Sequence, residues 1–336
     1  MRFTRTTIVL LASGLLLAAA AAAAWWSRAH PSGALEQIVV AANTEYVAVC
    51  PLVAAQENGY FRREGLNITF QRHNSGKAAL EATLAGRARL ATTADIPVMF
   101  AAMREVPLSV VATIFRTDID HGIVGNRSRG IEGPATLKGK RIGVTLSTSG
   151  HFVLHAFLNR QRLAASDVTM VNLQPNEFAA ALARGDVDAV ATWEPFLGNL
   201  LRQLGPQGVV FYGEDVYEIP YNMVGQRAYV TQHPAQMQKL VRGLIDGVQF
   251  CEAEPDAARA LMASTLQIDT SKWKTPWPSF RFKVALDQGL ILALEDETRW
   301  ATSNGLSPPH PMPNFLDYLY LDALEAVAPA AVTVIH

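Results

Sequence analysis

Two stretches of the sequence share one layout: AGRARLATTADIP at residues 85–97 and RGDVDAVATWEP at residues 184–195. In each, a glycine ends a helical pattern, a short apolar strand follows, and an acidic residue stands one or two positions before a proline. Because this layout occurs twice, it favours two similar lobes over one continuous sheet. The interface between two such lobes is a preferred place for a small-molecule site.

Around these stretches, short β-rich runs alternate with helical patterns, which is typical of βαβ units on a mostly parallel sheet. The tail from about residue 231 differs, because its long amphipathic patterns predict helices. We expect strands at residues 35–41, 67–71, 90–93, 108–115, 141–145, 168–172, 189–192 and 209–212, and helices at 51–59, 77–85, 96–103, 152–162, 178–184, 234–253, 256–263 and 280–289.

The composition of the chain narrows the class of protein. Of 336 residues, 49% are hydrophobic and 18% are charged, which excludes a disordered protein. The 29 basic residues balance 30 acidic ones, so the chain lacks the basic excess that draws proteins onto nucleic acid. Two cysteines are too few for a disulfide-stapled scaffold or a cysteine-rich metal fold. A globular α/β protein with no nucleic-acid partner remains.

The first thirty residues have the pattern of a targeting segment. Arg2 and Arg5 precede an apolar run at residues 8–24, whose alanine-rich end offers many A-x-A cleavage sites. This pattern indicates a secretory signal peptide. The alternative is an uncleaved anchor, because the run, together with Trp25 and Trp26, is at the lower limit for spanning a bilayer. Both interpretations predict export of the rest of the chain.

The two cysteines, Cys50 and Cys251, lie far apart in the sequence. Export permits a disulfide between them. Two buried free thiols, or a functional role for Cys50, are equally compatible with the sequence.

Two turns rich in small residues lie between an expected strand and an expected helix. One is Ser147-Thr148-Ser149-Gly150, and the other is Asn74-Ser75-Gly76 in the first series. The unpaired N–H groups and positive dipole end of a helix, with flanking hydroxyl groups, can bind an anion. The alternative is that these hydroxyl groups only cap their helices. Two such turns at equivalent positions of two lobes favour the anion site.

Polar and aromatic residues follow the short strands. Asp95 stands just before Pro97 and Glu194 beside Pro195, both at strand ends, where ligands bind in open α/β sheets. They can bind a cation or an amine, or they can cap the helices that follow. Trp193 and Tyr46 can line a ligand pocket or pack in the core.

No metal or cofactor is expected. The histidines at positions 73, 121, 151 and 155 lack the spacing of metal ligands, since the His151/His155 pair has neither an adjacent glutamate nor a third ligand. The chain contains no G-x-S-x-G, P-loop or G-x-G-x-x-G motif.

Several motifs, taken in order, make the chain resemble the periplasmic substrate-binding proteins of the nitrate, sulfonate and taurine ABC importers. That family also includes thiamine-pyrimidine binders. The resemblance covers roughly residues 36–330. It rests on CPLVAAQENGYF at 50–61 with EGL at 64–66, ALEA at 79–82, TADIP at 93–97, LKGKRIGV at 137–144, GDVDA at 185–189 and WEPF at 193–196.

The resemblance implies a type II-like periplasmic binding protein, with mixed, mostly parallel sheets joined by two hinge strands. The first lobe would comprise residues 36–121 and 222–330, with the C-terminal helices packed on it, and the second lobe residues 122–221. The implied ligand-binding residues are Tyr46, Cys50, Ser75, Gly76, Thr93, Ala94, Asp95, Ser147, Thr148, Ser149, Gly150, His151, Trp193, Glu194 and Asn222.

The resemblance also implies a function. We expect a monomeric, periplasmic solute-binding component of an ABC importer, tethered to the inner membrane if the N-terminal segment is not cleaved. It would capture a small anionic or zwitterionic solute, without chemistry, and deliver it to a permease and its ATPase. Asp95 and Glu194 favour a zwitterion such as taurine over plain nitrate or sulfate, because an unpaired carboxylate beside an anion is costly.

Two other classes of protein share the fold. One is an exported enzyme of the desulfinase type, with Cys50 as nucleophile and His73 or His151 as base. The position of Cys50 usually carries a small or hydroxyl residue, which is why this alternative arises. The other is a transcription-factor effector domain, against which the targeting segment and the missing helix-turn-helix argue.

Overall fold

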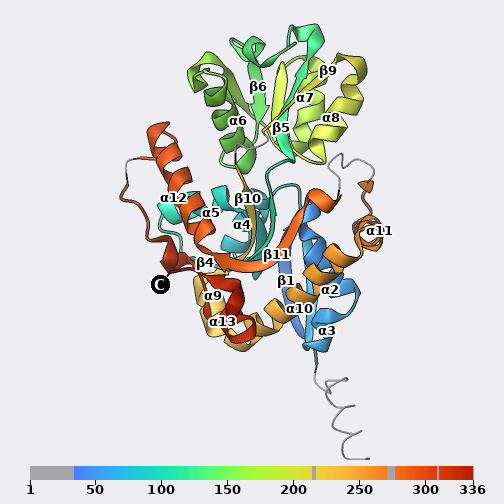
Figure 1. The fold of residues 1–336 in the computed structure, drawn as a ribbon, viewed down its shortest axis with the longest axis vertical. Coiled ribbons are helices and arrows are strands. Elements are labelled where there is room, and N and C mark those ends of the chain that lie inside the picture. Colours follow the sequence, from blue (N-terminus) through green and yellow to red (C-terminus); the bar gives the residue numbers. More distant parts are fainter. Residues whose placement is uncertain (1–33, 214–216, 271–276, 309, 336) are drawn as a thin grey trace, which may run out of the picture.

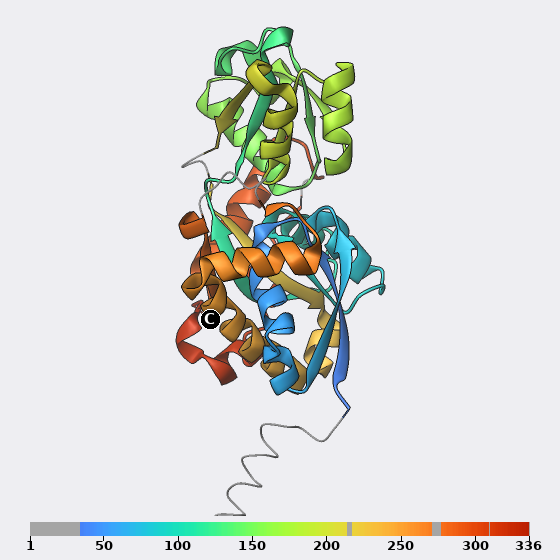
Figure 2. The ribbon, with the colours of Figure 1, turned by 90° about the vertical axis from the view of Figure 1, so that its right-hand side faces the viewer.

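A computed structural model describes residues 34–213, 217–270, 277–308 and 310–335. The expected targeting segment therefore lies outside the described residues. The chain forms two α/β lobes, one above the other in Figure 1, with the larger lobe below. Figure 2, a view turned by 90°, shows the same division. None of the helices in the described parts of the chain is long and apolar enough to cross a membrane.

The larger lobe is built on a seven-stranded sheet with the order β12-β11-β4-β10-β3-β1-β2. Strands β2, β1 and β3 are parallel, whereas β10 runs antiparallel to β3 and β4, and β11 antiparallel to β4. The bounds are β1 Glu36–Asn43, β2 Leu66–His73, β3 Leu90–Ala94, β4 Leu108–Thr117, β10 Ile219–Gln226, β11 Arg281–Asp287 and β12 Val332–Thr333.

Helices of the larger lobe include two that begin directly after the parallel strands. These are α4, Gly76–Leu84, after β2, and α5, Asp95–Met103, after β3. Ser75 begins α4 as its N-cap, since its Oγ accepts a hydrogen bond from Ala78 N at 3.2 Å. The remaining α-helices of this lobe are α2 Cys50–Glu57, α3 Tyr60–Arg63, α9 Arg227–Gln232, α10 Pro234–Ala253, α11 Pro255–Leu266, α12 Gln288–Ser303 and α13 Asp322–Val327.

The smaller lobe is built on a five-stranded sheet with the order β7-β6-β8-β5-β9. Strands β7, β6 and β8 are parallel, and β5 runs antiparallel to both of its neighbours, β8 and β9. The strands are β5 His121–Asn126, β6 Arg141–Val144, β7 Thr169–Asn172, β8 Ala189–Trp193 and β9 Gly208–Tyr212; the helices are α6 Ser149–Arg160, α7 Phe178–Arg184 and α8 Phe196–Leu204. The prediction of two mixed α/β lobes is confirmed.

The chain crosses between the lobes twice. It leaves the larger sheet at Thr117 and enters the smaller one at His121, and it returns to the larger sheet at Ile219. The resemblance implies changes of lobe at residues 121/122 and 221/222. The pairing of β10 with β3 and β4 places residues 219–221 in the larger sheet instead.

A disulfide holds the C-terminal part of the chain to the first helices. Cys50 on α2 is bonded to Cys251 on α10, with their Cα atoms 6.3 Å apart. The two helices approach closely at Gly247, where a Cβ would lie 2.1 Å from Pro51 O. A side chain at position 247 would therefore separate α10 from α2.

One expected helix is wrong. The sequence pattern predicts a helix at residues 280–289, yet 281–287 form β11, and α12 begins only at Gln288. Along β11, Phe282 and Val284 are buried while Arg281 and Lys283 are exposed. This alternation has the period of two that a strand requires, rather than the period of 3.6 of a helix.

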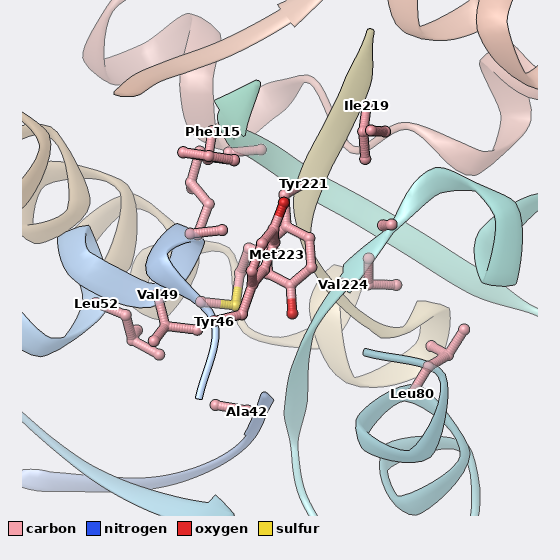
Figure 3. Packing of buried hydrophobic residues seen from close by; sticks show 14 of the residues in the cluster. Ala42, Tyr46, Val49, Leu52, Leu80, Phe115, Ile219, Tyr221, Met223 and Val224 are labelled. Carbon is pink, nitrogen blue, oxygen red and sulfur yellow. The ribbon is translucent and has the colours of Figure 1, made fainter. Parts of the chain in front are cut away.

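The core of the larger lobe reaches the surface that faces the smaller lobe. Figure 3 shows Tyr46 and Tyr221 side by side in this cluster. Their ring centroids are 5.1 Å apart, and Tyr46 packs edge-on against Phe115 at 5.7 Å. The residues at the junction of the lobes are therefore held on a closely packed base.

Candidate ligand-binding site

A cavity lies between the lobes, at the carboxyl ends of β1, β3 and β8. In an open α/β sheet this is the edge at which ligands bind. Its free volume is about 20 Å³, little more than a water molecule needs. The residues that line it are Asn43, Tyr46, Gly76, Lys77, Ala94, Pro97, His121, Thr148, Ser149, Trp193, Ile219 and Tyr221.

The N-termini of two helices meet at this cavity, α4 from the larger lobe and α6 from the smaller. Gly76 and Lys77 open α4, and Ser149 opens α6. The first N–H groups of a helix have no intrahelical acceptor. Since Ala78 N is already bonded to Ser75 Oγ, the N–H groups of Gly76 and Lys77 are the ones left to a ligand.

The same reasoning applies to α6. The N–H groups of His151 and Phe152 donate to Thr148 O at 3.0 and 3.3 Å. The N–H groups of Ser149 and Gly150 come before them in the helix and have no intrahelical acceptor. Two helix ends therefore present N–H groups and positive dipole ends to one cavity from opposite lobes.

Glycine at position 76 allows α4 to begin close to β3. A Cβ there would lie 2.8 Å from Thr93 Cα and 3.3 Å from Ala94 N, both backbone atoms. No larger residue fits without moving the start of the helix. The local sequence Ser-Gly thus both caps the helix and places its end at the cavity.

A chain of hydrogen bonds in the smaller lobe also reaches the cavity. His121 Nδ1 lies 2.6 Å from Asp120 Oδ1, and His121 Nε2 lies 2.9 Å from Ser149 Oγ. All three residues are buried, Asp120 fully. From the sequence, His121 was weighed only as a metal ligand. The contact with Ser149 depends on the folding of β5 beside α6, which no local pattern shows.

Aromatic side chains form the walls. Trp193 packs against the His121 ring at 5.9 Å, while Tyr46 and Tyr221 come from the larger lobe. Burial raises the pKa of Tyr46 well above its ordinary value, and the Asp120 carboxylate adds to the effect. Burial likewise raises the pKa of Tyr221. Both hydroxyl groups therefore keep their protons, and that of Tyr221 donates to Thr92 O at 3.2 Å.

The charge at the cavity is positive. Lys77 is its one lysine or arginine among the described residues, and no carboxylate lines it. Lys77 Nζ also donates to Leu146 O across the lobes at 3.0 Å. A cavity with two helix N-termini and a lysine suits a small anion.

Asp95, an expected ligand-binding residue, faces away from this cavity. Its Oδ1 accepts from Ile96 N at 2.8 Å, and its Oδ2 accepts from the Tyr217 hydroxyl. The Tyr217 hydroxyl also lies within hydrogen-bond distance of Glu297 Oε1 on α12. Burial raises the pKa of both carboxyl groups, and that of Glu297 is raised further by Asp95. The side chain of Asp95 therefore belongs to a buried cluster that joins α5, α12 and the strand crossing back from the smaller lobe.

Glu194 also makes the contacts of a helix cap. It is buried, and its Oε2 accepts from Gly198 N at 3.1 Å in the first turn of α8. Neither carboxylate lies among the cavity-lining residues. Asp95 and Glu194 each accept a hydrogen bond from a backbone N–H in the first turn of α5 and α8, as the alternative role in helix capping requires.

The other expected residues divide into two groups. Tyr46, Gly76, Ala94, Thr148, Ser149 and Trp193 line the cavity. The residues of the second group do not line the cavity and have other contacts. Cys50 is in the disulfide, Ser75 caps α4, and Thr93 lies behind Gly76. Gly150 packs on Trp193, Ser147 N donates to His151 Nδ1, and Asn222 accepts from Thr113 inside the sheet. His151 contacts Trp300 of α12, and burial lowers its pKa to about 3.

Sequence reasoning missed six lining residues, one of which is His121. Lys77 could have been predicted, because it follows the Ser-Gly turn that was identified as a helix start. The sequence could not have predicted the others, because their side-chain directions depend on the tertiary structure; they include Asn43, Pro97, Ile219 and Tyr221. Among the described residues, no cluster of three or more histidine, cysteine, aspartate or glutamate side chains can hold a metal ion.

Two α/β lobes around one cavity, with the chain crossing twice, are the fold of the periplasmic binding proteins of the SsuA and NrtA type. The chain belongs to the family described as NMT1/THI5 like, whose model matches residues 47–258.

Relatives of known description agree with this family. The chain is 27% identical to the taurine-binding periplasmic protein of Escherichia coli (strain K12) over 209 residues, 61% of this chain and 63% of that protein. It is 26% identical to a putative aliphatic sulfonates-binding protein of Bacillus subtilis (strain 168) over 228 residues, 66% of this chain and 68% of that protein. The match thus spans less than two thirds of the taurine-binding protein's length.

Among solved structures, the alkanesulfonate-binding protein SsuA from Xanthomonas axonopodis pv. citri, bound to MOPS, has the same fold. The TM-score is 0.72 at 22% identity, over 90% of this chain and all of that one.

The chain is also similar to a protein that is named as an enzyme. The chain is 25% identical over 228 residues to the 4-amino-5-hydroxymethyl-2-methylpyrimidine phosphate synthase of Aspergillus parasiticus. It also has the fold of a DSZB mutant in complex with biphenyl-2-sulfinic acid, with a TM-score of 0.64 at 18% identity. For this chain, the disulfide leaves Cys50 without the free thiolate that a cysteine nucleophile requires.

Proposed function

We propose that this protein is an exported, monomeric solute-binding component of an ABC importer, which captures a small anion in the cavity between its lobes. The observation that carries the proposal is the meeting of α4 and α6 at one cavity, each with two N–H groups free of intrahelical bonds. The sulfonate- and taurine-binding names of its relatives support the class of ligand.

Within this class, the contacts favour an anion without an amino group. A zwitterion such as taurine needs a partner for its ammonium group, and no carboxylate lines the cavity among the described residues. Asp95 and Glu194, which had suggested a zwitterion, are turned to other partners. We therefore infer a small sulfonate or nitrate as the ligand, with Tyr46 and Trp193 excluding water around it.

Binding closes the lobes because the ligand contacts both of them at once. A ligand that touches only one lobe binds open and closed forms equally and cannot shift their populations. In the structure, Lys77 Nζ to Leu146 O and Asn74 Nδ2 to Asn176 Oδ1 already connect the lobes at 3.0 and 3.4 Å. Closure around an anion would keep these contacts and add the bonds to the ligand.

The proposal extends to location and partners. The pattern of residues 1–30 indicates export to the periplasm, by a cleaved signal peptide or with the segment retained as an anchor. The closed form would then deliver the solute to a permease with its ATPase in the inner membrane. The transport relatives are periplasmic proteins, which agrees with this location.

The experiment is a thermal-shift screen of the exported protein against methanesulfonate, ethanesulfonate, taurine, nitrate and sulfate. A ligand at about 100 times its Kd adds roughly 2.7 kcal/mol of stability. We expect methanesulfonate, ethanesulfonate or nitrate to raise the melting temperature, and taurine to raise it less than ethanesulfonate does. Stabilisation by cationic compounds alone would overturn the proposal.

A further inference from the structure

The side chains of Asp120, His121 and Ser149 form an arrangement that the proposed anion binding does not use. In the chain of contacts, a carboxylate accepts from one nitrogen of a histidine, and the other nitrogen faces a serine hydroxyl. We propose that Ser149 is a nucleophile, activated by His121 and oriented through Asp120, which takes up the acyl group of a small ester bound in the cavity and passes it to water.

The distances are those of a nucleophile and its base. His121 Nε2 is 2.9 Å from Ser149 Oγ, within the range for proton transfer along a hydrogen bond. With Asp120 Oδ1 2.6 Å from Nδ1, the tautomer assigned from this network has its proton on Nδ1. Nε2 is then an acceptor, so the Ser149 hydroxyl donates its proton to it. Such a triad is recognised by geometry and roles rather than by sequence order.

The nucleophile and the base both face the cavity. Ser149 and His121 are lining residues, whereas Asp120 lies behind them and is fully buried. Burial in a site of low dielectric strengthens the interactions of the three groups. A substrate in the cavity therefore meets the hydroxyl oxygen and the imidazole together.

The same helix end supplies donors for the developing negative charge. The N–H groups of Ser149 and Gly150 open α6, a helix of twelve residues, and its positive dipole end lies at the nucleophile. Gly76 and Lys77 present N–H groups from the opposite lobe. An oxyanion formed at a carbonyl carbon bonded to Ser149 Oγ would lie within this group of donors.

The reaction balances with water as the one co-reactant. Ser149 Oγ bonds to the carbonyl carbon while its proton moves to His121 Nε2. The bond from that carbon to the alcohol oxygen breaks, and the alcohol leaves with the proton from Nε2. Water then attacks the acyl-serine, its proton moves through Nε2 to Ser149 Oγ, and a carboxylic acid is released. Nothing is oxidised or reduced.

The cavity limits the substrate to a small acyl group. The cavity is small and aromatic rings form its walls, so the acyl group must be small, with acetyl as the simplest case. The lining carries no carboxylate, among the residues the structure describes, to repel a developing oxyanion. The three residues lie in the smaller lobe and the first crossing segment, so the activity does not depend on the proposed transport function.

The test is acylation by p-nitrophenyl acetate, followed by peptide mass spectrometry of the full protein. We expect an acetyl group on Ser149 Oγ and release of p-nitrophenol. His121→Gln and Asp120→Asn should each lower the rate of Ser149 acylation by roughly 10²-fold or more, the range of general-base catalysis. Ser149→Ala should lose the labelled peptide. His233→Gln and Ser264→Ala, whose side chains bond to backbone elsewhere, serve as matched controls.

Two results would overturn the proposal. One is acetylation confined to lysines in the wild-type protein, and the other is an unchanged rate at Ser149 in His121→Gln. To separate loss of chemistry from loss of folding, the thiol introduced by Ser149→Cys should react with iodoacetamide under non-reducing conditions, and adding His121→Gln should slow that reaction. A ligand-induced thermal shift without Ser149 acylation leaves the transport function standing and refutes only this inference.

Discussion

An alanine at Gly76 tests how the end of α4 is placed at the cavity. A Cβ at this position would lie 2.8 Å from Thr93 Cα, 3.0 Å from Thr93 Oγ1 and 3.3 Å from Ala94 N. Two of these atoms are backbone and cannot turn away. Overpacking of this kind lowers the free energy of unfolding by about 1–3 kcal/mol. The better helix propensity of alanine offsets up to about 1 kcal/mol of this loss. We expect Gly76→Ala to lower the free energy of unfolding by about 1–2 kcal/mol.

The same substitution should weaken ligand binding, because the shifted helix end moves the N–H groups of Gly76 and Lys77. Loss of one hydrogen bond to a charged group is worth about 1.5–3 kcal/mol, which is tenfold or more in Kd. Urea unfolding measures the stability, and calorimetric titration with the best anion of the screen measures the affinity. The matched control is Gly133→Ala, where a Cβ meets nothing within 4 Å. An affinity in Gly76→Ala within twofold of the control would refute the reasoning.

Three further changes have defined outcomes. Replacing Cys50 and Cys251 together by serine removes a cross-link over 201 residues, and we expect a loss of about 5 kcal/mol in urea unfolding. Burial raises the pKa of Glu297, so the folded state keeps a proton on this carboxyl at pH values where the unfolded state has lost it. The resulting contribution to the free energy of unfolding is complete below the ordinary carboxyl pKa and is lost as the pH rises toward the raised pKa. Glu297→Gln should flatten that fall in melts from pH 4 to 8. Lys77→Met should lower anion affinity in calorimetric titration by tenfold or more.

Each of these changes has a control. Glu252→Gln alters an exposed carboxylate of α10 and should leave the pH dependence as it was. Lys239→Met breaks a surface ion pair with Glu36 and should leave anion affinity unchanged. If reduction of the disulfide by TCEP leaves the urea midpoint in place, the cross-link contributes nothing. An equal loss of affinity in both lysine variants would show that Lys77 acts only through net charge.

Much of the fold was predictable because its signals are local. The repeated glycine, strand and acid-proline layout indicated two lobes, and the two sheets confirm them. The pattern at 234–253 gave the bounds of α10. β11 was missed because apolar residues at 280, 282, 284, 285 and 286 do not alternate strictly in the sequence, and the alternation of burial appears only once β11 pairs with β4.

The site was predictable only in part. Helix starts are visible in the sequence, so Gly76 and Ser149 were identified as residues of the two turns. Side-chain direction is not visible, and Asp95 and Glu194 turn away from the cavity toward Tyr217 and Gly198. The contact of His121 with Ser149 joins residues 28 positions apart. Only the folded chain brings these two residues together.

The central claim is that backbone N–H groups from both lobes bind one anion. Titration of the ¹⁵N-labelled protein with ethanesulfonate, followed by amide NMR shifts, tests it most directly. We predict that the amide resonances of Gly76 and Lys77 on α4, and of Ser149 and Gly150 on α6, shift together with one midpoint. Shifts confined to one helix end, or absent from both while the protein still binds the anion, would contradict the account.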